Sequence, residues 1–159
     1  MTKIYKTHSL LPHNTFGIDA TAENFVEFSL VDDIVAFLSK GFDGRSLVIG
    51  GGSNLLFVND FDGTVFHSAI MGMEIVDENE NELLLRVGSG VNWDDLVAYT
   101  VEHGWCGMEN LSAIPGEAGA SAVQNVGAYG VEAGELIEKV EAVSIATGRK
   151  RMFTKTQTL

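Results

Sequence analysis

Glycine constrains this chain more than any other residue type, because the sequence holds 18 glycines and two prolines. Glycine adopts positive φ angles without strain and lets two backbones approach closely, so this composition favours many tight turns rather than disorder. Since 45% of the 159 residues are hydrophobic, the chain can also bury a core. We therefore expect a globular fold, built as one large domain or two small ones.

The first part of the sequence predicts a β-α-β unit over residues 24–66. Ser29 and Asp32 have the form of a capping box, which predicts a helix with Gly41 just past its end. Strands are expected over residues 24–30, 46–49 and 64–70, and the apolar run 55–58 also looks like a strand. A soft domain boundary is expected near residues 67–72.

The second part predicts a hairpin, a helix and two further strands. Two β-like runs within residues 74–87 flank a polar tip, and Asn92 with Asp95 forms a second helix-start signature. Gly104 would end that helix. Its apolar face consists of Trp93, Leu96, Val97, Thr100 and Val101. The last strands are expected over residues 140–146 and 150–154, joined at Thr147-Gly148.

A predicted strand leads into the glycine run Gly50-Gly51-Gly52-Ser53-Asn54. This run offers successive backbone N–H groups and two short polar side chains, which suits a pyrophosphate. No Gly-Lys-Ser/Thr follows, so the run is not a P-loop. Leu55 stands where a Rossmann fingerprint needs its third glycine, and no helix follows. On these residues alone, an anion-binding loop and a plain structural turn both remain open.

A second glycine pair, Gly88-Ser89-Gly90, follows a predicted strand and opens a helix. The third glycine position of a Rossmann fingerprint is here Trp93, a residue of the apolar helix face. We therefore interpret this segment as a structural turn between strand and helix.

The stretch Ile114–Gly130 combines many small residues with little charge. Such a segment either lets elements pack closely or lets a large flat ligand lie against the backbone. Gln124 and Asn125 supply hydrogen-bond donors and acceptors, and Tyr129 supplies an aromatic face with a hydroxyl. A tightly packed turn explains the glycines but not the amide pair.

The net charge of −12 argues against a nucleic-acid partner, although a local group of donors can still hold an anionic cofactor. The single cysteine, Cys106, is expected to be a small buried hydrophobe. We expect a cytoplasmic protein with no membrane segment, because the N-terminus lacks an export signal. The histidines show no metal-ligand spacing and are expected in surface or packing roles: His8, His13, His67 and His103.

Four strings in order resemble the bacterial UDP-N-acetylenolpyruvoylglucosamine reductase (MurB) family. They are NTFGI at 14–18, IGGGSNLLF at 49–57, GMENL at 107–111 and IPGEAGASAVQNVGAYGVE at 114–132. The resemblance implies an α+β fold of the vanillyl-alcohol-oxidase (PCMH) type of FAD-binding domain, made of two α+β subdomains. Residues 1–68 match the first subdomain, and residues 69–159 match an incomplete second one.

The resemblance also implies a site for noncovalently bound FAD, since Ser53 stands where relatives with covalent flavin can carry a histidine. The implied FAD-binding residues are Ile49, Gly50, Gly51, Gly52, Ser53, Asn54, Leu55, Ile114, Pro115, Gly116, Gly119, Ala120, Ser121, Gln124, Asn125, Gly127, Ala128 and Tyr129. Asn125 and Tyr129 are expected nearest the flavin ring or the substrate.

In the implied reaction, NADPH reduces FAD, which then reduces the enolpyruvyl ether of UDP-N-acetylglucosamine enolpyruvate to UDP-N-acetylmuramate for peptidoglycan synthesis. The family's tyrosine-arginine pair, proton-donating serine and acidic residue belong to sequence beyond Leu159. The ending Thr156–Leu159 looks like an interruption, so no catalytic residue is assigned and the fragment alone is expected to be inactive.

Two other functions remain open on the sequence. One is a different flavin oxidase or dehydrogenase with the same fold. The other is a noncatalytic nucleotide-binding or interaction module.

Overall fold

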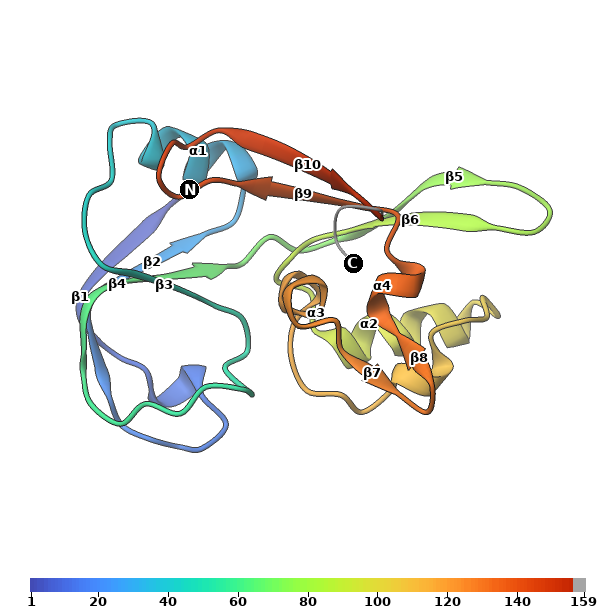
Figure 1. Cartoon of the computed structure of the whole chain (residues 1–159), viewed down its shortest axis with the longest axis horizontal. Helices are drawn as coiled ribbons and strands as arrows, with labels where there is room; N and C mark the ends of the chain where they lie inside the picture. Colours follow the sequence, from blue (N-terminus) through green and yellow to red (C-terminus); the bar gives the residue numbers. More distant parts are fainter. Residues whose placement is uncertain (156–159) are drawn as a thin grey trace.

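A four-stranded sheet in the order β1-β2-β4-β3 forms the first part of the computed structural model, which describes residues 1–155 (Figure 1). Strand β1 runs antiparallel to β2, whereas β2 and β3 both run parallel to β4. The elements of this part are β1 (Lys3–Ser9), η1 (Leu11–His13), β2 (Thr21–Phe28), α1 (Val31–Leu38), β3 (Ser46–Ile49) and β4 (Phe61–Ser68). The expected interruption at Thr156–Leu159 lies outside the described residues.

The predicted β-α-β unit is present as β2, α1 and β3, with β4 inserted between the two parallel strands. The predicted capping box is wrong, because Leu30 occupies the N-cap position and no side chain caps the helix. Gly41 follows the helix end with φ +87° and donates its N–H to the Leu38 carbonyl. The apolar run 55–58 is not a strand, because Leu55 and Phe57 pack from a loop onto the core beneath the sheet.

The second part is built around α2 (Trp93–Glu102), whose start is as the sequence predicts. The Asn92 side chain accepts hydrogen bonds from the N–H groups of Asp94 and Asp95 at 2.9 and 3.2 Å. Trp93 is buried and donates from its indole to the Leu111 carbonyl at 2.9 Å. Val101 was expected on the buried face but is 52% exposed, because it lies at the last turn, beyond the core.

Around α2 lie the remaining short elements of the second part. They are β5 (Met73–Glu78), β6 (Leu83–Val87), η2 (Glu109–Leu111), α3 (Ala118–Gln124), β7 (Gly127–Ala128), β8 (Val131–Glu132) and α4 (Ala133–Leu136). Strands β5 and β6 form the predicted antiparallel hairpin, which projects away from the body (Figure 1). Cys106 is exposed, against expectation, since it lies in the loop that leaves α2 rather than on the buried face.

A hairpin of β9 (Lys139–Val143) and β10 (Lys150–Thr154) returns to the first part and runs beside α1 (Figure 1). The predicted strand 140–146 is shorter in the structure, because the turn begins at Ser144. Val143 and Ile145 pack against a core cluster that the first part supplies, made of Val26, Ile34, Leu38 and Phe66. The division at residues 68 and 69 stays a prediction, and this hairpin shares a core with the first part.

The architecture is thus a mixed α+β fold in which the glycine run Gly50–Asn54 leaves β3 toward the second part. Within residues 1–155, no helix has both the length and the apolarity that crossing a membrane requires.

Candidate functional site

The glycine run and the start of α3, more than 60 residues apart in sequence, lie against each other. An ideal Cβ on Gly50 would lie 3.1 Å from the Ala120 Cβ, and one on Gly51 would lie 3.7 Å from the Gly116 Cα. Ser53 Oγ donates a hydrogen bond to the Pro115 carbonyl at 3.1 Å. The glycine run and the glycine-rich stretch that begins at Ile114 therefore meet at one site in the structure.

A second hydrogen bond closes the same contact further along α3. Asn54 Nδ2 donates to Gln124 Oε1 at 2.9 Å, and both residues are exposed. The bond occupies one amide group of each side chain and leaves the Gln124 NH₂ and the Asn54 oxygen available as donor and acceptor. We call Gly50–Asn54 together with residues 115–120 the glycine cradle.

The backbone of the glycine cradle holds a row of unused donors. Within residues 1–155, the N–H groups of Gly51, Gly52, Ser53 and Asn54 donate no hydrogen bond to another protein group. Gly52 is buried, and a buried N–H without an acceptor is costly. A row of successive N–H groups fits an anionic acceptor such as a pyrophosphate.

Gly52 also has a structural reason to be glycine. Its φ is +66°, and an ideal Cβ would lie 1.9 Å from the His13 carbonyl oxygen. The Gly52 carbonyl accepts a hydrogen bond from the Thr15 N–H at 3.4 Å. The end of η1 and the loop after it therefore pack directly against the glycine run. Close packing explains Gly50 and Gly52, whereas Gly51 has room for a side chain and is exposed.

Several of the predicted FAD-binding residues lie away from this contact. Ile49 is buried in the core of the first part, and Leu55 packs against the same core. Ile114 packs against the core of the second part, and the buried Ser121 donates to the Ala118 carbonyl within α3. Gly119 belongs to the cradle segment, but its Cβ position faces the other glycine turn and would lie 2.7 Å from the Ser89 Cβ.

The end of the glycine-rich stretch forms a separate open hollow. It is lined by Asn125, Gly127, Ala128, Tyr129, Gly130, Val131, Glu132 and Glu135. Asn125 ends α3 at φ +45°, donates to Glu132 Oε2 at 2.6 Å and accepts from the Gly134 N–H at 2.8 Å. Tyr129 lies at the hairpin tip between β7 and β8, with 89% of its surface exposed. Their predicted contacts with flavin or substrate stay predictions.

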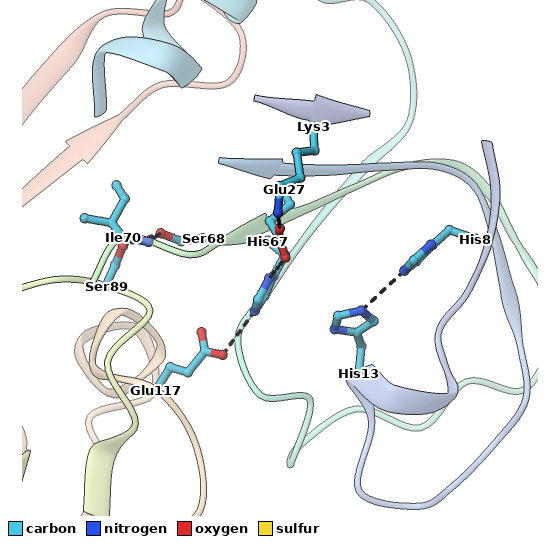
Figure 2. Close-up of polar contacts among 9 residues, drawn as sticks. All are labelled: Lys3, His8, His13, Glu27, His67, Ser68, Ile70, Ser89 and Glu117. Carbon is cyan, nitrogen blue, oxygen red and sulfur yellow. Dashed lines mark hydrogen bonds and ion pairs between the residues drawn. The ribbon is translucent and has the colours of Figure 1, made fainter. Parts of the chain in front are cut away.

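A chain of charged side chains lies beside the glycine cradle (Figure 2). His67 Nε2 is 3.1 Å from Glu117 Oε1, and His67 Nδ1 is 3.7 Å from Glu27 Oε2. Glu27 in turn accepts from Lys3 Nζ at 2.9 Å. The hydrogen bond that Glu117 accepts from the His67 ring raises the pKa of His67 against the opposing effect of burial, and Lys3 chiefly lowers the pKa of Glu27.

Two further histidines share a face of the sheet with His67. The rings of His8 and His13 pack tilted against Phe25, with centroids 4.4 and 4.5 Å from its ring. Figure 2 shows that their side chains point toward each other, and their Nε2 atoms are 3.4 Å apart. Burial lowers the pKa of His13, and the charges of His67 and His8 act in the same direction. The structure therefore gathers three histidines that the sequence analysis treated as spread out.

An irregular backbone brings His8 to this face. In a regular strand, residues three apart point to opposite faces, yet the rings of Tyr5 and His8 are 5.0 Å apart. Between them Thr7 has φ +48°, which is rare for a β-branched residue. Within the described part of the chain, no three His, Cys, Asp or Glu side chains, these histidines included, are placed so that they could hold a metal ion together.

Glu117 and His67 are the site residues that sequence reasoning missed. One signal for Glu117 was available, because it is the only charged residue in Ile114–Gly130. A carboxylate retained among small residues indicates a specific partner. His67 had no such signal, since its partner lies 50 residues away in sequence.

Known proteins resemble this chain over most of its length. The reductase named UDP-N-acetylenolpyruvoylglucosamine reductase from Bacteroides fragilis (strain YCH46) is 51% identical over 151 residues, covering 94% of this chain and 45% of the relative. The protein of the same name from Porphyromonas gingivalis (strain ATCC BAA-308 / W83) is 47% identical over 152 residues, with the same coverage of both chains. The resemblance found in the sequence is confirmed, and the chain spans about half the length of these relatives.

A solved structure supports the fold. The crystal structure of UDP-N-acetylenolpyruvylglucosamine reductase (MurB) from Thermus caldophilus superposes with a TM-score of 0.72 at 22% identity, covering 98% of this chain and 53% of that one. The expected α+β fold of the PCMH-type FAD-binding domain is thereby confirmed. The family model described as FAD binding domain matches residues 28–152, so the chain belongs to the family of FAD-binding domains.

Proposed function

We propose that this chain is the FAD-binding part of an NADPH-dependent reductase that converts UDP-N-acetylglucosamine enolpyruvate to UDP-N-acetylmuramate in peptidoglycan synthesis. Membership of the FAD-binding family and relatives named as this reductase support the proposal. The chain covers 45% of those relatives, so the complete reaction is assigned to a longer protein. On its own this chain binds flavin and does not turn over. We also propose a cytoplasmic location, because the proposed substrates are soluble nucleotides.

The observation that carries the proposal is the row of unused N–H groups in the glycine cradle. Gly51, Gly52, Ser53 and Asn54 present these groups next to Gly116, where the lack of a side chain leaves the backbone accessible. A pyrophosphate offers several acceptor oxygens to such a row, and hydrogen bonds to a charged acceptor are about twice as strong as neutral ones. We therefore assign the FAD pyrophosphate to this row.

The roles of the neighbouring residues follow from their positions. Ser53 and Asn54 hold the run against Pro115 and Gln124, which keeps the donors at a fixed distance from α3. The small residues of α3 leave room for the flavin ring to lie against the backbone. The exposed Tyr129 is assigned to the flavin or substrate end of the site. Bound FAD supplies the hydride-transfer chemistry, while this chain binds and orients it without a covalent bond.

A flavin-binding measurement tests the proposal on this chain. The purified chain mixed with FAD is expected to retain the flavin absorption spectrum through gel filtration. Gly51→Val, which places a branched side chain in the cradle, is expected to lose it. A folded chain that elutes without flavin would refute binding by this part alone.

A turnover measurement tests the reductase assignment. The longer protein, supplied with NADPH and the enolpyruvyl UDP-sugar, is expected to consume NADPH only when both are present. If it ignored this sugar and oxidised another alcohol or acid, the reductase assignment would be wrong, and a different flavin enzyme of the same fold would replace it.

A further inference from the structure

The side chains that join β4 to α3 form an alternating chain of charges across four elements (Figure 2). Lys3 on β1 meets Glu27 on β2, Glu27 meets His67 on β4, and His67 meets Glu117 at the start of α3. His67 and Glu117 each keep only 15% of their side-chain surface exposed. Because partly buried charges are weakly screened, each of these groups depends on its neighbours for compensation.

Glu117 is the N-cap residue of α3 and lies beside the glycine run. Its carbonyl accepts hydrogen bonds from the N–H groups of Ala120 and Ser121, at 3.0 and 3.1 Å, which form the first turn of the helix. Its side chain also contacts the glycine run, since an ideal Cβ on Gly50 would lie 3.3 Å from Glu117 Oε2. A shift of Glu117 would therefore move the wall of the cradle relative to the row of N–H donors.

We propose that His67 and Glu117 are positioning residues for flavin binding, which hold α3 at a fixed distance from the glycine run and keep the neighbourhood of the pyrophosphate free of net negative charge. This inference rests on the proposed function, because it concerns the same cradle. Neither residue needs to touch the cofactor. Their contribution is to the geometry and the local charge.

The net charge of these four side chains depends on the proton carried by His67. With His67 protonated, the two cations Lys3 and His67 balance the two carboxylates Glu27 and Glu117. When His67 loses its proton, one negative charge is left uncompensated beside the cradle. The titratable and charged groups that face His67 are Glu117 from α3, Glu27 from β2 with Lys3 from β1 behind it, His13 from η1, and His8 from β1 beyond His13.

The direction of the pH effect follows from the two carboxylates. The hydrogen bond to Glu117 is the largest cause that raises the pKa of His67, and the charge of Glu27 adds to it. The four side chains together are therefore neutral below the raised pKa of His67. They acquire a net negative charge as the pH rises through that pKa. FAD affinity is expected to weaken in that direction.

The first experiment measures the FAD dissociation constant of the chain between about pH 6 and about pH 8.5, by fluorescence quenching. Wild type is expected to weaken about tenfold as the pH rises. His67→Gln is expected to bind as weakly at low pH as wild type does at high pH, with no further change. His103→Gln is the matched control, because His103 is the C-cap residue of α2 and contacts Tyr99 and Trp105. If His67→Gln kept the wild-type pH profile, the inference would be overturned.

The second experiment uses the chain without FAD, so that it remains decisive if the flavin assignment fails. Nuclear magnetic resonance follows the titration of the His67 ring and the hydrogen exchange of the Ala120 and Ser121 amides. The near-isosteric Glu117→Gln is expected to lower the pKa of His67 and to speed exchange at both amides. Glu74→Gln, an exposed carboxylate on β5, is the control.

The two experiments separate two kinds of failure. A wild-type chain that binds no FAD at any pH contradicts the proposed function, and the apo titration and exchange then decide the positioning role alone. If Glu117→Gln left both the His67 titration and the α3 amides unchanged, the positioning role would be excluded whatever the flavin result.

Discussion

Two glycine turns in this chain look alike in sequence and differ in their hydrogen bonds. In Gly88-Ser89-Gly90, the N–H of Gly88 donates to the Gly72 carbonyl and that of Gly90 donates to the Ile70 carbonyl, both at 2.9 Å. In the cradle, the N–H groups of Gly51 and Gly52 donate to no other group of residues 1–155. The comparison teaches that glycine content alone does not distinguish the two turns, whereas a row of successive unused donors does.

The two turns also use glycine for different reasons. An ideal Cβ on Gly88 would lie 2.3 Å from the Ile70 carbonyl oxygen, and one on Gly90 would lie 2.5 Å from that of Ser68. Both glycines therefore serve close packing of two backbones, as expected from the sequence. Gly51 in the cradle meets nothing closer than 3.7 Å, so packing does not require glycine there.

The largest effect is expected at Gly52, the glycine of the cradle with the closest contact. Gly52→Ala combines a positive φ with a Cβ position 1.9 Å from the His13 carbonyl oxygen, so the backbone must move. We expect the free energy of unfolding to fall by about 4 kcal/mol, measured by urea denaturation. A loss below about 1 kcal/mol would contradict this prediction, because it would show that the backbone around Gly52 accepts the added methyl without strain.

Gly88→Ala should be nearly as damaging and should differ in its effect on flavin. The added methyl meets the backbone of Ile70, and we expect a loss of about 3 kcal/mol without the cost of a positive φ. The protein that remains folded is expected to bind FAD with unchanged affinity, because the N–H groups of Gly88 and Gly90 already donate to backbone carbonyls. Reduced FAD affinity in the folded fraction would mean that this turn also contacts the cofactor.

The sequence predicted the local elements of this fold where periodicity and capping agree. Asn92 caps α2 as its spacing with Asp95 indicates, and β3 has the predicted bounds of residues 46–49. The capping box at Ser29 and Asp32 failed, because the chain leaving β2 puts Leu30 at the N-cap position. A helix-start motif therefore forms its cap only where the preceding chain places the capping residue at the N-cap position.

Contacts between distant segments were beyond prediction from residue patterns. The glycine run and α3 were singled out separately, but their meeting at Gly50 and Ala120 depends on the path of about 70 intervening residues. The pairing of His67 with Glu117 depends on the same path. The helix α3 itself was missed, because its small residues carry no apolar periodicity and it is held by backbone bonds to Val91 and Ser89.

Gly51→Ala sharpens the comparison, because it adds a methyl where packing allows one. We expect the free energy of unfolding to change by less than about 0.5 kcal/mol, since a contact at 3.7 Å is ordinary. The methyl narrows the space between the run and Gly116, so FAD affinity is expected to fall about tenfold, or about 1.4 kcal/mol. Titration of FAD into both proteins at one pH measures this, with Gly88→Ala as the control for an added methyl. Unchanged FAD affinity would contradict the assignment of the pyrophosphate to this row of N–H donors.

The smallest effect is a difference in pH response between the two turns. The pKa of His67 is raised by its hydrogen bond to Glu117, so its stabilisation is complete below its unfolded value of about 6.5 and is lost as the pH rises through the folded pKa. The pKa of His13 is lowered, mainly by burial, so its stabilisation is present above about 6.5 and is lost as the pH falls. The hydrogen bonds of the Gly88–Gly90 turn join neutral groups.

Native-state amide hydrogen exchange tests that difference within one molecule. After correction for the intrinsic pH dependence of exchange, protection of the Ala120 and Ser121 amides is expected to fall as the pH rises above about 6.5. Protection of the Gly88 and Gly90 amides is expected to stay constant over the same range, provided that the chain stays far from global unfolding. Parallel changes at all four amides would mean that the His67–Glu117 pair stabilises the turn together with the cradle, which the Gly119 N–H to Ser89 carbonyl bond joins, rather than the cradle alone.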